Sequence, residues 1–336
     1  MNSTHVRAHR QADGVPTLTL DGLTIQLKTR RGTANVVDRV DLEVWPGEIV
    51  GLIGESGSGK SLTAFSIFDL LPKAARVVGG DIRLGARSLV GLSAPGMRAI
   101  RGDRIALIPQ DPLSSLNPVL RVGRQVGEPL VLHRGSRWRQ ALARAVSLLA
   151  SVHLPQPAER AGEYPHQFSG GMRQRAMSAM SIALEPELLV ADEPTTALDV
   201  TIQAQFLHLL REIRDEHRTS ILLITHDLGV VAELCDWVYV MYAGRILEQG
   251  PVERIFAQPA HPYTQDLLQA TPTVETQRSE LTAIPGSVPS PYDTPEGCRF
   301  APRCSRRFDR CDEEPPFFAA AAEHLTRCWL EEDAHG

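Results

Sequence analysis

The eight residues GESGSGKS at positions 54–61 constrain the fold of this chain more than any other stretch. Their spacing, G-x-x-x-x-G-K-S, is the phosphate-loop pattern. Glycine has no Cβ, so such a loop turns tightly and aims several backbone N–H groups at one anion, and a helix starting near Lys60 adds its positive end. Because the loop follows the apolar run Glu48–Ile53, we predict a buried strand, a polyphosphate-binding loop and a helix in this order.

Two residues of this loop have distinct expected roles. Lys60 is expected to neutralise the β- and γ-phosphates of a nucleotide, and the Ser61 hydroxyl is expected to be one ligand of Mg²⁺. A glycine-rich loop without a ligand is the bland alternative. By itself the loop leaves a choice among kinases, GTPases, motors and transport ATPases. The other members of the predicted nucleotide-binding set in this loop are Gly54, Glu55, Ser56, Gly57, Ser58 and Gly59.

Length and composition narrow the class of protein. The 336 residues suffice for one large or two medium domains with real cores. A net charge of −5 and a pI near 6.1 argue against broad electrostatic attraction to nucleic acid, and the basic run Arg134–Arg139 is expected to be a solvated face. The first 16 residues are polar and no segment reaches about 18 consecutive apolar residues, so we expect neither a secretory signal nor a membrane span.

A second apolar strand ends in two acids, as a phosphate-loop site requires. The run Glu187–Glu193 reads ELLVADE. Asp192 is expected at the carboxyl end of a buried parallel strand, where it can hold Mg²⁺ through water. Glu193 follows directly and is placed to orient and partly deprotonate the water that attacks the γ-phosphate, as a general base does. The alternative is a pair of acids in a surface turn.

A second anion-binding helix start lies upstream, in Tyr164–Arg175, where a serine and two glycines open a helical segment. With two phosphate-reading elements of different kinds, the chain resembles the ATP-binding subunits of ABC transporters. Ser169, Gly170 and Gly171 look like the signature motif of that family, which in relatives contacts the γ-phosphate of an ATP held by the opposite subunit. Phe168 and Met172 stand where leucine and glutamine are commoner.

Further elements of the ABC family fall in order along the chain, and the resemblance implies their roles. Gln110 matches the glutamine loop, which contacts magnesium and the attacking water. Asp199 matches the loop that crosses the dimer interface, and His226 matches the switch histidine that touches the γ-phosphate. Outside this constellation, His226 would be interpreted as a structural capping residue. The position of the aromatic residue that stacks on adenine falls near Leu27, so apolar contact is expected to replace stacking.

The resemblance covers residues 18–330 and narrows to the oligopeptide and dipeptide importer branch, in particular to the D-type subunit of dipeptide importers. The segments that carry this narrower resemblance are Gln110–Pro118, Phe168–Arg175, His261–Thr264 and Gly297–Cys304. Nickel, glutathione and some sugar importers share the same C-terminal extension, so the branch leaves the cargo open.

Strand and helix patterns predict an α/β nucleotide-binding sheet. We expect a P-loop ABC ATPase with a RecA-like core over residues 16–255, interrupted by a helical subdomain over about 113–185 that contains a helix at 138–149. Residues 256–336 are expected to form a loop-rich extension, because prolines multiply there and four cysteines would compensate for a poor core. The expected strands are 18–28, 40–53, 105–109, 188–192, 221–225 and 236–242.

The resemblance implies an ATP hydrolase that couples nucleotide-driven dimerisation to the uptake of di- or oligopeptides. One phosphate loop and one signature per chain require a second ABC ATPase subunit, expected to be similar but distinct. The other implied partners are two transmembrane permease subunits and an extracytoplasmic substrate-binding protein, which places the chain peripherally on the cytoplasmic face of the cell membrane. The alternatives are a soluble ABC ATPase acting on DNA or ribosomes and an electron carrier built on the cysteines.

Four cysteines near the C-terminus are spaced C-x5-C-x6-C-x16-C, and Cys235 stands apart as an expected buried residue. The wide spacing lacks the C-x₂₋₄-C pairs typical of zinc sites, and the importer extension is associated with a four-iron, four-sulfur cluster. We therefore predict a [4Fe–4S] cluster, with zinc and an empty thiol group as alternatives. The expected ligands are Cys298, Cys304, Cys311 and Cys328, and the arginines expected to offset cluster charge are Arg299, Arg303, Arg306, Arg307 and Arg310.

Overall fold

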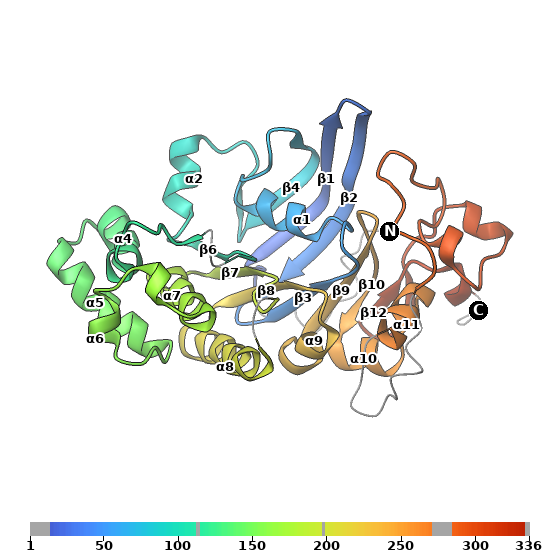
Figure 1. The fold of residues 1–336 in the computed structure, drawn as a ribbon. Helices are drawn as coiled ribbons and strands as arrows, with labels where there is room; N and C mark the ends of the chain where they lie inside the picture. Colours follow the sequence, from blue (N-terminus) through green and yellow to red (C-terminus); the bar gives the residue numbers. More distant parts are fainter. Residues whose placement is uncertain (1–13, 112–114, 197–198, 271–283, 333–336) are drawn as a thin grey trace. The chain divides into compact units, whose positions relative to one another are not determined.

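A computed structural model describes residues 14–111, 115–196, 199–270 and 284–332. The chain divides into two compact units, each built from segments that are separate in the sequence (Figure 1). Unit 1 contains residues 1–45, 50–90 and 224–336, and unit 2 contains residues 46–49 and 91–223. The phosphate loop and the C-terminal extension therefore belong to the same unit.

Unit 1 contains an antiparallel sheet with the strand order β2-β1-β4-β5. Strand β1 forms a long hairpin with β2, and β4 pairs with the other edge of β1. Leu18, Leu20, Leu23 and Ile25 of β1 are almost fully buried, so this strand supplies much of the core beneath the hairpin. The strands are β1 (Leu18–Thr29), β2 (Gly32–Val44), β4 (Ala75–Leu84) and β5 (Arg87–Ser88).

Five further strands of unit 1 lie side by side in the order β11-β12-β10-β9-β3. Strands β3 and β9 are parallel, and all of their residues are buried, as expected for apolar runs covered on both faces. Cys235 is buried, as predicted. The strands are β3 (Ile49–Ile53), β9 (Trp237–Tyr242), β10 (Arg245–Pro251), β11 (Phe318–Ala321) and β12 (His324–Thr326).

The predicted strand at 40–53 is wrong as a single element. It consists of the end of β2 and all of β3, separated by a turn at Pro46 and Gly47. Proline has no N–H to donate to a strand ladder, and Gly47 has φ +70°, a left-handed conformation that glycine adopts without strain. The chain therefore changes sheet at this turn.

The described part of the extension over residues 256–336 consists mostly of loops, as predicted, and it also carries two short strands. Strand β12 pairs antiparallel with β10, with Glu248 opposite Thr326, so the extension continues the sheet of unit 1. The helices of unit 1 are α1 (Lys60–Ile67), α9 (Leu228–Leu234), α10 (Val252–Ala257) and α11 (Pro262–Gln269), with 3₁₀ turns η4 (Ala301–Arg303), η5 (Asp309–Asp312) and η6 (Trp329–Glu331).

Unit 2 has the strand order β8-β7-β6, and β6 and β7 are parallel. Helices α4, α5 and α7 pack together (Figure 1). Gly127 of α4 lets the helices approach closely, because a Cβ there would lie 2.9 Å from the Ala141 carbonyl oxygen of α5. The strands are β6 (Ile105–Ile108), β7 (Leu188–Asp192) and β8 (Ser220–Thr225), and the helices are α2 (Ala94–Ile100), α4 (Val122–Arg134), α5 (Trp138–Ser151), α6 (Pro157–Arg160), η3 (Pro165–Gln167), α7 (Gly170–Ser181) and α8 (Val200–His217).

The predicted helix at 138–149 is confirmed as α5, with two additional residues at its end. The residues from 134 to 139 are mostly exposed, in agreement with the solvated basic face expected there. Residues 113 and 114, at the start of the predicted helical subdomain, lie outside the described residues. No helix among the residues that the structure describes is long and apolar enough to cross a membrane. The domain boundaries at 113, 185 and 256 stay predictions.

Candidate active site

The loop between β3 and α1 requires glycine at two positions for steric reasons. Gly54 has φ +149°, and a Cβ on it would lie 2.0 Å from the Met241 carbonyl oxygen. Gly59 has φ +108°, and its Cβ would lie 2.8 Å from the carbonyl oxygen of Val36. The strand, loop and helix occur in the predicted order, and α1 begins at Lys60.

The ammonium group of Lys60 is folded back over the loop that precedes it. Its Nζ donates hydrogen bonds to the carbonyl oxygens of Gly54 at 2.7 Å and Glu55 at 2.9 Å. Lys60 is only 5% exposed, and Ser58 is fully buried beside it. The loop is thus arranged around a cation, as a polyphosphate site requires.

Glu55, the second residue of the loop, is bound by the C-terminal extension, which the sequence reasoning missed. Its backbone N–H donates to the Tyr263 hydroxyl at 2.9 Å, and both of its carboxylate oxygens accept from Nη1 of Arg303 at 3.1 Å. From the sequence, the motif of Tyr263 indicates the importer branch, and Arg303 is predicted to offset the charge of a metal cluster; neither residue is predicted to contact the phosphate loop. The sequence signal that could have revealed this contact is Glu55 itself, because a carboxylate in an anion-binding loop calls for a cationic partner.

Two predicted nucleotide-site residues of unit 1 that lie outside the phosphate loop are found at the ends of β8 and β1. His226 directly follows β8 and is exposed. The next residue, Asp227, caps α9 by accepting from the N–H groups of Gly229 at 2.9 Å and Val230 at 3.3 Å. Leu27 is half-buried near the end of β1. The predicted roles of Leu27 and His226 stay predictions.

Unit 2 carries the two predicted acids at the carboxyl end of β7. Asp192 is the last residue of the strand and is 1% exposed. Glu193 has φ +46°, a left-handed conformation that is uncommon for residues with a Cβ. Such strain of about 1–3 kcal/mol persists where the surroundings demand it, and it concentrates at active sites.

Gln110 and Glu193, which were predicted to serve the same attacking water, are brought together within unit 2. Nε2 of Gln110 donates to Oε2 of Glu193 at 2.9 Å. The Thr196 hydroxyl lies 3.2 Å from the same carboxylate oxygen. These two donors orient the Glu193 carboxylate. Residues 112–114 of the motif that begins at Gln110 lie outside the described residues.

The predicted signature forms the start of α7. Ser169 caps the helix, with its Oγ accepting from the N–H of Met172 at 3.3 Å, and both Ser169 and Gly170 are exposed. Gly171 packs against α8, because a Cβ on it would lie 2.8 Å from Cγ2 of Ile202.

The loop of Asp199 adjoins the signature through α8. Asp199 caps this helix by accepting from the N–H of Ile202 at 3.0 Å, and Ile202 is the residue that packs on the signature. The signature and the Asp199 loop are therefore neighbours. Residues 197 and 198 lie outside the described residues.

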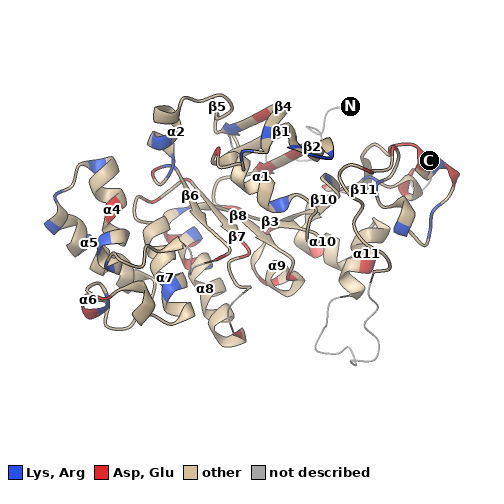
Figure 2. Cartoon of the chain, turned by 45° about the horizontal axis from the view of Figure 1, so that its top comes forward, with Lys and Arg blue, Asp and Glu red and all other residues tan. Residues whose placement is uncertain are grey.

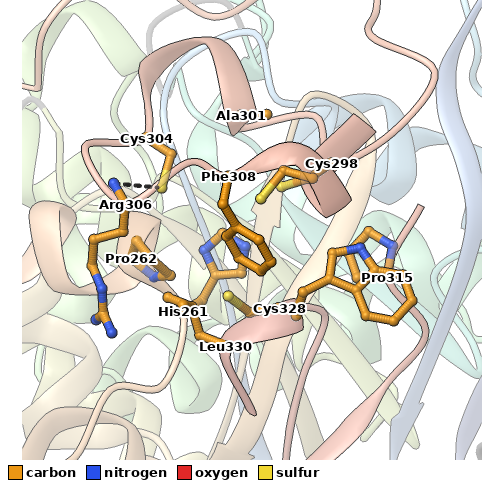
Figure 3. Close-up of a pocket in the computed structure, with 12 residues that line it drawn as sticks. His261, Pro262, Cys298, Ala301, Cys304, Arg306, Phe308, Pro315, Cys328 and Leu330 are labelled. Atoms are coloured by element: carbon orange, nitrogen blue, oxygen red, sulfur yellow. Dashed lines mark hydrogen bonds between the residues drawn. The ribbon is translucent and has the colours of Figure 1, made fainter. Parts of the chain in front are cut away.

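All four cysteines of the extension line one pocket in unit 1, together with His261 (Figure 3). Burial, with smaller contributions from the neighbouring thiols, raises the pKa of Cys298 to about 11 and that of Cys328 to about 12. The backbone N–H of Arg306 donates to the sulfur of Cys304 at 3.4 Å. Burial also lowers the pKa of His261 to about 4, so its imidazole is neutral at pH 7.

The structure does not support the predicted metal centre. The described part of the chain contains no group of three or more His, Cys, Asp or Glu side chains that could hold a metal ion.

The arginines expected to offset a cluster charge mostly have carboxylate partners, and acidic and basic residues are interspersed in this part of the chain (Figure 2). The pairs are Arg299 with Asp38, Arg303 with Glu55, Arg307 with Asp312 and Arg310 with Glu332.

The strand, glycine loop and helix with Lys60 form a phosphate loop in unit 1, and β7 of unit 2 ends in Asp192. Both features are typical of P-loop nucleotide hydrolases. Two family models match the chain. The model described as ABC transporter matches residues 37–196, and the model described as oligopeptide/dipeptide transporter, C-terminal region, matches residues 247–311.

Relatives with assigned names match almost the whole chain. A provisionally named peptide import ATP-binding protein of Brucella abortus (strain 2308) is 47% identical over 313 residues, which cover 93% of this chain and 94% of the relative. A similarly named protein of Brucella melitensis biotype 1 is 48% identical over 331 residues, which cover 94% of this chain and 98% of the relative.

Solved structures agree with these matches. A dimeric ATP-binding cassette in a post-hydrolysis state, bound to ADP and Pi, has a TM-score of 0.63 and 26% identity, and covers 70% of this chain and 98% of that chain. The chain belongs to the ABC transporter family of ATP-binding proteins. It is a transport ATPase with the α/β fold of a P-loop ABC ATPase.

Proposed function

We propose that this chain is the ATP-hydrolysing subunit of an importer for di- and oligopeptides. The observation that carries the proposal is the match of residues 247–311 to the oligopeptide/dipeptide transporter C-terminal region. The names of the Brucella relatives support the same cargo class. Nickel, glutathione and sugars are the alternative cargoes within this branch.

In the proposed reaction, the oxygen of a water molecule attacks the γ-phosphorus of ATP, and the bond from that phosphorus to the β–γ bridging oxygen breaks. Glu193 accepts the proton of the water, and ADP and inorganic phosphate leave. The hydrogen bond from Gln110 at 2.9 Å orients the Glu193 carboxylate for this step. Lys60 and the loop amides bind the β- and γ-phosphates, and His226 contacts the γ-phosphate.

The donors predicted for Mg²⁺ are of the kind this ion prefers. Ser61 offers a hydroxyl, Asp192 a carboxylate that is 1% exposed, and Gln110 an amide oxygen. When bound, Mg²⁺ neutralises charge on the phosphates. We assign these three side chains as its protein ligands.

The proposed complex contains further chains. One phosphate loop and one signature in this chain call for a second ABC ATPase subunit, whose ATP the signature at Ser169–Gly171 would contact. Two permease subunits would carry the peptide across the membrane, and an extracytoplasmic binding protein would deliver it. In this arrangement the chain binds peripherally on the cytoplasmic face of the membrane.

The cargo proposal is tested by purifying the native complex with its binding protein and measuring ATP hydrolysis with candidate ligands. We expect di- or oligopeptides to stimulate hydrolysis, because the loaded binding protein favours the closed ATPase dimer. Nickel, glutathione and a sugar serve as matched controls. Stimulation by one of the controls and by no peptide would transfer the assignment to that cargo.

We further propose that the cysteine pocket holds a [4Fe–4S] cluster. Support comes from four thiols lining one pocket, two of them 9% exposed. A [4Fe–4S] cluster takes four cysteine thiolates as ligands, which is the number of cysteines that line this pocket. A structural role is the simplest one for it.

Anaerobic purification followed by iron, sulfide and zinc analysis tests this assignment. We expect a brown protein with about four irons and four sulfides per chain, and loss of both in Cys311→Ser. Cys235→Ser is the matched control, because Cys235 lies away from the pocket and its substitution should leave the iron content unchanged. A colourless protein with stoichiometric zinc and no iron would rule out the cluster.

A further inference from the structure

Arg303 belongs to the cysteine-bearing extension, yet its side chain lies against the phosphate loop. Nη1 of Arg303 is 3.1 Å from each carboxylate oxygen of Glu55. The Arg303 side chain is 6% exposed and that of Glu55 is 25% exposed, so this ion pair is largely shielded from water. An ion pair in such surroundings interacts more strongly than one on the surface.

The guanidinium of Arg303 is fixed by several contacts besides Glu55. Its Nε donates to the Pro285 carbonyl oxygen at 2.7 Å, its Nη2 to the Ile284 carbonyl oxygen at 3.3 Å, and its Nη1 to the Tyr242 hydroxyl at 3.2 Å. The guanidinium carbon also lies 5.8 Å from the ring centre of Phe300. A cation held in this way presents its charge to Glu55 at a defined place.

Glu55 itself is held at three points. Its N–H donates to Tyr263, its carbonyl oxygen accepts from Lys60, and its carboxylate accepts from Arg303. Tyr263 is fully buried and packs on Tyr242 with ring centres 4.7 Å apart. The conformation of the loop at this residue therefore depends on side chains of the extension.

A carboxylate in a polyphosphate-binding loop opposes its ligand. An unpaired Glu55 would repel the negative phosphates and compete for the ammonium of Lys60, which already contacts the Glu55 backbone. The ion pair with Arg303 neutralises the Glu55 carboxylate, so that the Lys60 ammonium remains available to bind the phosphates. None of the comparisons with known proteins assigns this role to the extension.

We propose that Arg303 is a positioning residue of the ATP site, which neutralises Glu55 and holds the phosphate loop in the shape that binds ATP. It acts through Glu55 and does not touch the nucleotide. The inference rests on the assignment of the loop to ATP and is independent of the cargo and of the cysteine cluster. The C-terminal extension, which identifies the oligopeptide and dipeptide importer branch, would then also help to form the ATP site.

Equilibrium binding of Mg-ATP to the full-length chain, measured by calorimetry, tests the proposal. We expect Arg303→Gln to raise the Kd about tenfold, which corresponds to about 1.4 kcal/mol. Arg307→Gln is the matched control, since it removes an exposed arginine–carboxylate pair whose members, Arg307 and Asp312, both belong to the extension. The control should bind ATP as the unmodified chain does.

Two further variants separate charge neutralisation from a general structural role. Glu55→Gln combined with Arg303→Gln should return the Kd to within about threefold of the unmodified chain, because neither charge is left unpaired. Arg303→Lys keeps the charge but loses the guanidinium donors to the carbonyl oxygens of Ile284 and Pro285, so its Kd should lie between those of the unmodified chain and Arg303→Gln. A double variant as weak as Arg303→Gln, or a lysine variant as weak, would overturn the proposal.

The failure of this inference can be told apart from the failure of the proposed function. If the unmodified chain does not bind Mg-ATP, the assignment of the loop to ATP is wrong. If the unmodified chain binds and Arg303→Gln binds with the same Kd, the loop assignment stands and the role of Arg303 is wrong.

Discussion

Glu193→Gln is expected to lower ATP hydrolysis at this site roughly 10²- to 10⁴-fold while leaving ATP binding nearly intact. The amide can still accept the hydrogen bond from Gln110, which lies 2.9 Å from the carboxylate, so the local geometry should survive. The amide cannot accept the proton of the attacking water. Steady-state hydrolysis and equilibrium binding, measured on the same preparation, separate these two effects.

Glu187→Gln is the matched control for this substitution. Glu187 lies at the other end of the same strand segment, is about half exposed and pairs with Arg104 at 2.7 Å. The same loss of a carboxylate there should leave hydrolysis within about twofold, because exposed ion pairs contribute little. Near-normal turnover of Glu193→Gln in the assembled complex would show that Glu193 is not the general base.

Lys60→Ala is expected to weaken ATP binding by about 10- to 150-fold, the effect of losing hydrogen bonds to a charged group. The phosphate loop surrounds the Lys60 ammonium, whose Nζ donates to the carbonyl oxygens of Gly54 at 2.7 Å and Glu55 at 2.9 Å. Removing it leaves the phosphates facing the loop without this charge. The Kd of Mg-ATP for the full-length chain measures the loss directly.

Lys73→Ala provides the control for Lys60→Ala, because Lys73 is an exposed lysine of the same unit. It should bind ATP with unchanged affinity. Equal affinity of Lys60→Ala and the unmodified chain would count against the assigned role of the loop lysine.

The parts of the site that local sequence patterns could predict are those that depend on neighbours in the chain. The strand, loop and helix around Lys60 follow from glycine spacing and an apolar run, and the start of α7 follows from a capping serine. The acid at the end of β7 follows from the same kind of pattern. Each of these elements is found where it was predicted.

The features that local sequence patterns could not predict depend on contacts between distant segments. The pairing of β12 with β10 joins residues about 76 positions apart, which no local pattern encodes. The hydrogen bonds between Arg303 and Glu55 span 248 positions. The predicted strand at 40–53 is too long because apolar residues recur on both sides of Pro46 and Gly47. The turn at these two residues ends one sheet and begins another.

The charges of the extension were also interpreted without their partners. Arg299 and Arg303 were expected to face a cluster, because only their proximity to cysteines in the sequence was visible. In the folded chain Arg299 is buried against Asp38 and Arg303 against Glu55. Buried arginines need carboxylate or carbonyl partners, and those partners come from segments before residue 60.

The most direct test of the central claim is peptide uptake into proteoliposomes that contain the assembled complex, with the binding protein and labelled peptide outside and Mg-ATP inside. The predicted result is accumulation of peptide together with release of inorganic phosphate, both lowered when this chain carries Glu193→Gln. Uptake that continues without ATP hydrolysis, or hydrolysis and uptake that are unchanged by Glu193→Gln, would contradict the account.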